Sequence, residues 1–217
     1  MSYTVKEIYF TMQGEGVHTG RSAVFLRFAG CNLWDGMEYH RAGAVCRFCD
    51  TDFFGTDGVR GGKYASADAV ADVVREVWDE STSPGVSDHD ARFVVCTGGE
   101  PALQLDDVLV ATLKQRGFYV AIETNGTVPT AEGIDWVCVS PKAEADIVVR
   151  SGNELKLVYP QQGAPPDRYA GLGFEYFSLQ PMDGPDIEMN TRRALEFCRA
   201  NPRWRLSLQT HKLLGIP

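Results

Sequence analysis

Between residues 30 and 51 the chain reads Gly30-Cys31-Asn32-Leu33-Trp34, a long insert, and then Cys46-Arg47-Phe48-Cys49-Asp50-Thr51. This stretch holds half of the six cysteines, in the spacing C-x14-C-x2-C. Three thiolates can hold three corners of a four-iron cluster and leave the fourth iron open to another ligand. A zinc site, a structural disulfide and a redox CxxC pair are the alternatives. Zinc usually takes four ligands, and no histidine accompanies these thiols at zinc-finger spacing.

Composition narrows the class of protein. The formal net charge of −8 argues against tight binding to a nucleic-acid backbone, which requires clustered lysines and arginines. The first residues show no basic segment followed by an apolar core, and no apolar run approaches membrane-spanning length. We therefore expect a cytoplasmic protein without nucleic-acid or membrane partners, whose thiols are metal ligands or buried small side chains.

Hydrophobic periodicity predicts short strands that alternate with a few helices. Strands are expected at residues 22–28, 92–97, 119–123, 136–139, 154–159, 175–179 and 205–208, after an extended segment at 3–10. Helices are expected after Ser66, at 105–116 and at 190–200, with loops at 35–44 and 53–63 and a connection at 81–90. Strand after strand ends in polar, Gly- or Pro-containing residues, which is typical of ligand sites at the carboxyl ends of parallel strands. The prediction is an α/β fold, a partial (β/α) barrel of six or so mainly parallel strands, in one domain spanning 1–217.

Two motifs resemble those of the radical S-adenosylmethionine superfamily. Its cluster loop usually reads C-x3-C-x2-C with an aromatic residue before the last cysteine, a position that Phe48 fills. The gap between the first and second cysteines is wider here. This costs little free energy, because the entropy lost on closing a loop depends only weakly on the length of the loop. Gly98-Gly99-Glu100-Pro101 resembles the motif that binds the amino group of the methionine moiety, where a carboxylate suits an ammonium.

A longer series of motifs resembles one family of that superfamily, the 7-carboxy-7-deazaguanine synthases. The series is Gln13-Gly14-Glu15-Gly16, Arg27-Phe28-Ala29-Gly30-Cys31-Asn32-Leu33, Cys49-Asp50-Thr51, Thr97-Gly98-Gly99-Glu100-Pro101, Glu123-Thr124-Asn125-Gly126-Thr127, Ser140-Pro141-Lys142 and Gln209-Thr210-His211-Lys212. The resemblance implies a radical, Mg2+-dependent carbon–nitrogen lyase of queuosine and deazapurine biosynthesis. It would take a hydrogen from C6 of 6-carboxy-5,6,7,8-tetrahydropterin, contract the ring, release ammonia and regenerate S-adenosylmethionine.

The resemblance also implies roles for individual residues. The [4Fe-4S] cluster is expected on Cys31, Cys46 and Cys49, and Mg2+ on Thr51. Substrate contacts are expected from Met12, Gln13, Gly14, Arg27, Thr97 and Pro217. Contacts to S-adenosylmethionine are expected from Phe48, Cys49, Asp50, Gly99, Glu100, Thr124, Asn125, Ser140, Pro141, Lys142, Gln180, Pro181, Met182 and Asp183. No catalytic residue is expected beyond the cofactor's radical chemistry, and His211 suits a base or a structural hydrogen bond.

Two other functions remain open from sequence. One is an activating enzyme that makes a glycyl radical on a partner protein, and the other is a non-catalytic iron–sulfur or zinc-binding interaction protein. The resemblance further implies a homodimer and a flavodoxin-like electron donor. The sequence leaves open why the cysteine loop is long and whether the product enters tRNA or a secondary metabolite.

Overall fold

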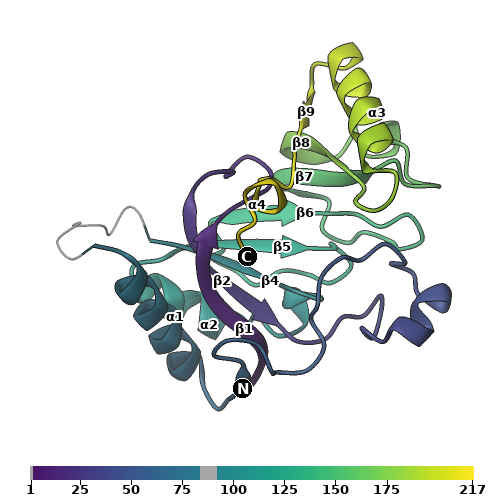
Figure 1. Ribbon diagram of the computed structural model, residues 1–217. Coiled ribbons are helices and arrows are strands. Elements are labelled where there is room, and N and C mark those ends of the chain that lie inside the picture. The colour runs from purple at the N-terminus through teal and green to yellow at the C-terminus, as the bar shows by residue number, and fades with distance from the viewer. Residues whose placement is uncertain (1, 84–91) are drawn as a thin grey trace.

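The computed structural model describes residues 2–83 and 92–217, so the connection expected at 81–90 lies mostly outside the described residues. Within the described part, nine strands form one sheet in the order β3-β1-β2-β4-β5-β6-β7-β8-β9 (Figure 1). The strands are β1 (Tyr3–Met12), β2 (Ser22–Phe28), β3 (Gly62–Tyr64), β4 (Phe93–Gly98), β5 (Tyr119–Thr124), β6 (Trp136–Val139), β7 (Ser151–Tyr159), β8 (Gly173–Pro181) and β9 (Trp204–Leu206). The α-helices are α1 (Ala67–Ser81), α2 (Asp107–Gln115), α3 (Ile187–Ala200) and α4 (Thr210–Leu214).

The predicted α/β fold with a mostly parallel sheet and few helices is confirmed. Strands β2 and β4 to β9 pair in parallel, whereas β1 pairs antiparallel with both β2 and β3. In the N-terminal third of the chain, three segments differ from the prediction. Residues 3–10 belong to a full strand, the loop at 53–63 ends in β3, and the loop at 35–44 contains the 3-10 helix η1 (Glu38–Gly43).

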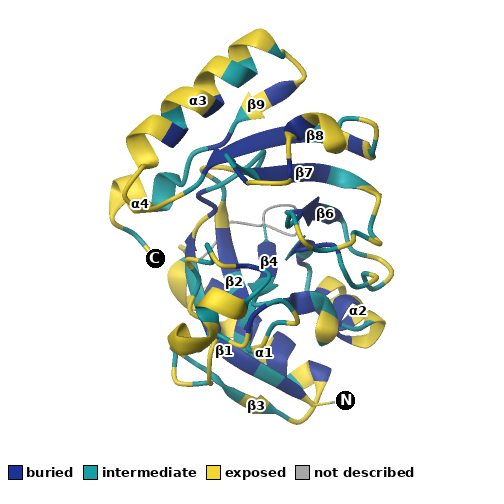
Figure 2. Ribbon diagram, turned by 90° about the vertical axis from the view of Figure 1, so that its right-hand side faces the viewer, coloured by how far each residue is buried: buried dark blue, intermediate teal, exposed yellow. Residues whose placement is uncertain are grey.

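Helices α1 and α2 cover one face of the sheet. Ser66 begins α1 as predicted, because its side chain accepts a hydrogen bond from the amide of Ala69. The buried stripe of α1, which includes Val70 and Val74, packs with Leu109 and Leu113 of α2 into the main core. Figure 2 shows the buried residues of both helices turned inward and the exposed ones outward. A second core, under α3, is formed mainly by β7, β8 and β9.

The inner face of the sheet changes from apolar to polar along the strands. In β4, residues Phe93 and Val95 alternate with core residues and belong to a third buried cluster inside the barrel. The same alternation places Thr97, at the strand's carboxyl end, on that inner face. Polar inner residues therefore gather where the parallel strands end.

The chain after β9 returns to the beginning of the molecule. The amide of Thr210 donates to the carbonyl of Gly14 at 2.9 Å, and the hydroxyl of Thr11 donates to the carbonyl of Pro217 at 2.7 Å. In Figure 1, α4 and the C-terminus accordingly lie against the strands of the N-terminal half. This return lays residues from the last part of the chain beside the end of β1.

Candidate active site

A cavity of about 350 Å³ lies at the carboxyl ends of the strands. The structure brings nearly all of the predicted site residues to it: Met12, Gln13, Gly14, Arg27, Cys31, Cys46, Phe48, Cys49, Asp50, Thr51, Thr97, Gly99, Thr124, Asn125, Ser140, Lys142, Gln180, Pro181, Met182, Asp183 and Pro217. Glu100 and Pro141 do not line it. A single cavity thus collects residues from the N-terminal strands, the cysteine loop, the later strand ends and the C-terminus.

The three cysteines of the loop face this cavity. The Cys46 thiol, hydrogen-bonded to Cys49, lowers the pKa of Cys49 to about 6, against the effect of burial. The same hydrogen bond, followed by burial, raises the pKa of Cys46, and burial raises that of Cys31. In the described residues no three His, Cys, Asp or Glu side chains are close enough to hold one metal ion. Three thiols that face one cavity can hold three corners of an iron–sulfur cluster and leave the fourth iron open.

The long insert supports the cysteine loop from outside. Arg41 of η1 donates to the carbonyls of Arg47 and Cys49 at 3.0 and 2.9 Å. Its guanidinium also lies 4.1 Å from the ring centroid of Trp34. One side chain of the insert therefore holds the backbone between the second and third cysteines.

The glycines of the second motif allow close packing of backbone. A Cβ on Gly99 would lie 2.2 Å from the carbonyl oxygen of Gly30 and 2.7 Å from Cβ of Cys31. Gly98 has a φ of +143°, and a Cβ there would lie 2.3 Å from the carbonyl of Phe28. The end of β4 therefore presses directly against the start of the cysteine loop.

Glu100 differs from the expectation drawn from its motif. It is fully buried, and its carboxylate accepts hydrogen bonds from the amide of Ala102, the hydroxyl of Thr124 and the amide of Asn125, at 2.9, 2.7 and 2.7 Å. Burial raises its pKa. In this structure Glu100 joins the ends of β4 and β5 behind the cavity wall, because three internal donors take up its oxygens.

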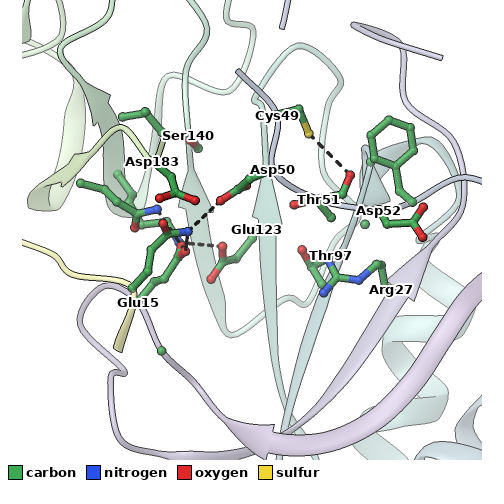
Figure 3. Close-up of a pocket in the computed structure, with 18 of the residues that line it drawn as sticks. Glu15, Arg27, Cys49, Asp50, Thr51, Asp52, Thr97, Glu123, Ser140 and Asp183 are labelled. Atoms are coloured by element: carbon green, nitrogen blue, oxygen red, sulfur yellow. Dashed lines mark hydrogen bonds and ion pairs between the residues drawn. The ribbon is translucent and has the colours of Figure 1, made fainter. Parts of the chain in front are cut away.

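One side of the cavity carries a guanidinium and two hydroxyls. Figure 3 shows Arg27, Thr97, Thr51 and Asp52 together on this side, and Arg27 and Thr97 are also direct partners in the pairing of β2 with β4. Arg27 donates to Glu7 and to the hydroxyl of Tyr9, both at 2.8 Å. A guanidinium has five N–H groups, so donors remain for an anionic ligand.

The loop that carries Thr51 is anchored to the sheet. The ammonium of buried Lys6 lies 2.8 Å from Asp52 and 2.7 Å from Asp57, and it donates to the carbonyl of Phe54 at 2.9 Å. Asp52 follows Thr51 directly and also lines the cavity. Asp52 was missed in the sequence, because an aspartate in a Gly-rich loop carries no distinguishing pattern.

The other side of the cavity contains a buried charge cluster that sequence reasoning also missed. Lys156 lies 2.6 Å from Glu15 and 2.7 Å from Glu123. Burial lowers the pKa of Lys156, but the two carboxylates raise it well above its usual value. Gln13 donates to the other oxygen of Glu123 at 2.8 Å. A lysine inside the apolar strand 154–159 was the available signal, since alternation puts it on the inner face.

The residues that follow β5 and β6 make two separate sets of hydrogen bonds. Lys142 donates to the carbonyl and the hydroxyl of Ser140 at 2.6 and 2.9 Å, and Asn125 donates to Asn32 at 3.0 Å. Asn32 lies next to Cys31, so this contact joins β5 to the cysteine loop. Asn125, Ser140 and Lys142 are held by these hydrogen bonds and line the cavity.

The C-terminal motif also reaches the cavity. Gln209, His211 and Lys212 line it together with Pro217. A Cβ on Gly14 would overlap the imidazole of His211, so this ring packs directly on the Gly14 backbone. Residues 210–212 of this motif form the first part of the short helix α4, and Gln209 is its N-cap residue, so the segment is not the irregular end of a strand.

Within residues 2–83 and 92–217, no helix is long and apolar enough to span a membrane. All six cysteines, each of which is described, are free thiols. Cys96 and Cys138 are buried in the cores, in accord with the packing role expected for small apolar side chains.

Comparison with known proteins identifies the family. No family model matches the chain. The chain is 58% identical over 217 residues to the 7-carboxy-7-deazaguanine synthase of Caulobacter vibrioides and 57% identical over 216 residues to that of Bradyrhizobium diazoefficiens, covering 100% of each chain. The crystal structure of QueE from Escherichia coli matches with a TM-score of 0.65 at 28% identity, covering 96% of this chain and 94% of that one. The chain belongs to the 7-carboxy-7-deazaguanine synthase family.

Proposed function

We propose that the chain converts 6-carboxy-5,6,7,8-tetrahydropterin into 7-carboxy-7-deazaguanine with loss of ammonia, as a radical S-adenosylmethionine lyase of queuosine or deazapurine biosynthesis. The observation that supports this most strongly is that three thiols and Arg27 line one cavity at the strand ends. A cofactor on the thiols and a carboxylate on the guanidinium would then belong to one reacting complex. The full-length relatives named above support the same reaction.

The proposal assigns the cofactors to three places in the cavity. Cys31, Cys46 and Cys49 would hold a [4Fe-4S] cluster, the strand-end side chains of β5, β6 and β8 would surround S-adenosylmethionine, and Thr51 would bind Mg2+. When bound, the cluster and S-adenosylmethionine supply the one-electron chemistry that removes the hydrogen atom from C6. A single hydroxyl suits Mg2+, which keeps waters and takes substrate oxygens as further ligands.

The chain's own residues position the substrate. Arg27 would pair with the carboxylate at C6, and this pairing sets the reacting carbon toward the thiol side of the cavity. Glu123 and Gln13, which are hydrogen-bonded to each other, keep a further lone pair and a second N–H on the opposite side, and these suit the N–H groups and the oxygen of a pterin ring. The C-terminal segment adds Gln209, His211, Lys212 and Pro217 to the lining of the cavity.

Further parts of the proposal follow from the same assignment. The whole span 1–217 acts as one domain, two copies form a homodimer, and a flavodoxin-like protein donates the electron. A reducing compartment, the cytosol, suits a protein whose three loop thiols must stay unpaired. A glycyl-radical activator or a non-catalytic metal-binding protein is the competing function.

The deciding experiment is an anaerobic assay of reconstituted protein with dithionite, S-adenosylmethionine, Mg2+ and 6-carboxytetrahydropterin. We expect a product with the ultraviolet spectrum and mass of 7-carboxy-7-deazaguanine, and no product from Cys49→Ala. Cleavage of S-adenosylmethionine without this product would reject the substrate and favour an activator. Zinc without sulfide in the purified protein would favour the non-catalytic alternative.

A further inference from the structure

The motif Gln209-Thr210-His211-Lys212 makes contacts in two directions. On one side, Gln209 donates to Glu15 at 2.9 Å and to Asp50 at 3.0 Å. Lys212 donates to the carboxylates of Asp50 and Asp183, each at 2.6 Å. One short segment therefore holds two acidic side chains that come from loops far apart in the sequence.

Asp50 and Asp183 need a cation between them. Asp50 follows Cys49, the third cysteine of the loop, and Asp183 lies just after β8. Figure 3 shows both side chains beside the strand ends. Two carboxylates this close repel each other, and one ammonium in contact with both offsets that repulsion. The side chains of Lys212, Asp50 and Asp183 are 38%, 40% and 41% exposed, so this bridge stands at the rim of the cavity.

On its other side the segment contacts the end of β1. The amide and the hydroxyl of Thr210 both donate to the carbonyl of Gly14, at 2.9 and 3.0 Å, and His211 packs on the same glycine. The carbonyl of Pro217 accepts from Thr11. Residues 11–14 belong to the side of the cavity where the substrate is proposed to bind.

We propose that Lys212 and Gln209 are positioning residues that couple the S-adenosylmethionine side of the cavity to the substrate side through the C-terminal segment. Lys212 and Gln209 hold Asp50 and Asp183 in place for the polar groups of a nucleoside-type ligand. A ligand that orders these two carboxylates also orders the segment, and the segment orders residues 11–14. By linkage, binding on one side then strengthens binding on the other by the same factor. The identity of the two ligands rests on the proposed function. The statement that Lys212 and Gln209 order the C-terminal segment does not depend on it.

The first test needs no cofactor. Hydrogen exchange of the amides of residues 210–216 is measured in the wild-type chain and in Lys212→Met. The matched control is Lys114→Met, because Lys114 is 42% exposed and forms a comparable ion pair with Asp135, remote from the cavity. We expect about tenfold faster exchange at Thr210 and Ile216 in Lys212→Met and no change there in Lys114→Met.

The second test measures coupling. The affinity of the reconstituted protein for S-adenosylmethionine is determined with and without 6-carboxytetrahydropterin. We expect the pterin to tighten binding about tenfold in the wild type and Lys114→Met, and to have little effect in Lys212→Met and Gln209→Ala. Lys212→Arg should retain part of the coupling, since a guanidinium can also bridge two carboxylates.

Three outcomes would overturn the proposal. The first is equal exchange in Lys212→Met and Lys114→Met. The second is faster exchange with unchanged coupling, which would make the segment merely structural. The third is an absence of coupling in a wild-type protein that forms the deazaguanine product. If the wild type forms no product but Lys212→Met still exchanges faster than Lys114→Met, the proposed function is rejected. The conclusion that Lys212 orders residues 210–216 then still holds.

Discussion

The ammonium of Lys156 lies 2.7 Å from a carboxylate oxygen of Glu123, across the inside of the barrel. Their strands, β7 and β5, are separated in the sheet by β6, so the contact spans two strand positions. The side chain of Lys156 is only 4% exposed, which leaves these carboxylates as its main compensation. Glu15 completes the cluster from the turn after β1. Three charged groups with a net charge of about −1 therefore form one wall of the cavity.

Removal of Lys156 should strongly destabilise the protein. Lys156→Met leaves Glu15 and Glu123 without their shared cation, and loss of one partner of a buried ion pair costs about 3–5 kcal/mol. Urea unfolding measures the loss, with exposed Lys63→Met as the control. The double variant Lys156→Met/Glu123→Gln should lose less than the single variant, because one uncompensated charge is gone. A loss below about 1 kcal/mol in the single variant would contradict this picture.

The same cluster predicts how stability depends on pH. Burial raises the pKa of Glu15, but Lys156 and Gln209 outweigh burial and hold the pKa below its ordinary value of 4.5. Since the folded pKa is the lower one, Glu15 stabilises the fold above pH 4.5, and this contribution disappears as the pH falls through the folded pKa. Unfolding free energies of wild type and Glu15→Gln should therefore differ most at neutral pH and converge in acid. A constant difference across this range would show that the carboxylate charge plays no part.

Gly99 offers a separate test of the cysteine loop. Gly99→Ala would place a Cβ 2.2 Å from the carbonyl of Gly30 and 2.7 Å from Cβ of Cys31, so the loop must move. We expect overpacking to cost about 1–3 kcal/mol and the reconstituted protein to hold much less iron and sulfide. Exposed Gly171→Ala is the control, because nothing lies within 4 Å of the added methyl group. Full iron content in Gly99→Ala would mean that the loop tolerates the displacement.

The local sequence pattern was enough to predict where most of the cavity lies in the fold. Polar residues that follow the predicted strands marked the end of the sheet where a ligand would bind, and Thr97, Ser140 and Gln180 do line one cavity there. The orientation of Glu100 could not be inferred in this way. Its motif is compatible with a ligand, but its three internal donors come from the two strand ends that only the fold brings together.

Long-range pairing explains the remaining differences. The β-branched and aromatic residues of 3–10 predict an extended segment, but only its partners, β2 and β3, make it an antiparallel strand. The sequence of 154–159 predicts a strand with a lysine inside it, and the carboxylates that compensate this lysine lie at Glu15 and Glu123. Charge partners more than thirty residues away leave no local trace in the sequence.

Arg27 should determine specificity for a carboxylated substrate. Its guanidinium is fixed by Glu7 and Tyr9 and lines the cavity beside Thr97 and Thr51. Arg27→Met removes the charge and the remaining N–H donors, and a hydrogen bond to a charged group is worth about 1.5–3 kcal/mol. We therefore expect the Kd of 6-carboxytetrahydropterin to rise about 10- to 100-fold.

A second pterin makes this prediction specific. The Kd of tetrahydropterin without the carboxylate should change little in Arg27→Met, so the variant loses the discrimination between the two compounds. Glu7→Gln is the matched control, because it keeps the guanidinium in place through Tyr9 while it removes the competing carboxylate. In this control discrimination should persist. If both pterins bind Arg27→Met more weakly by the same factor, Arg27 supports the cavity wall and does not recognise the carboxylate, and the substrate would have to lie in the cavity in another orientation.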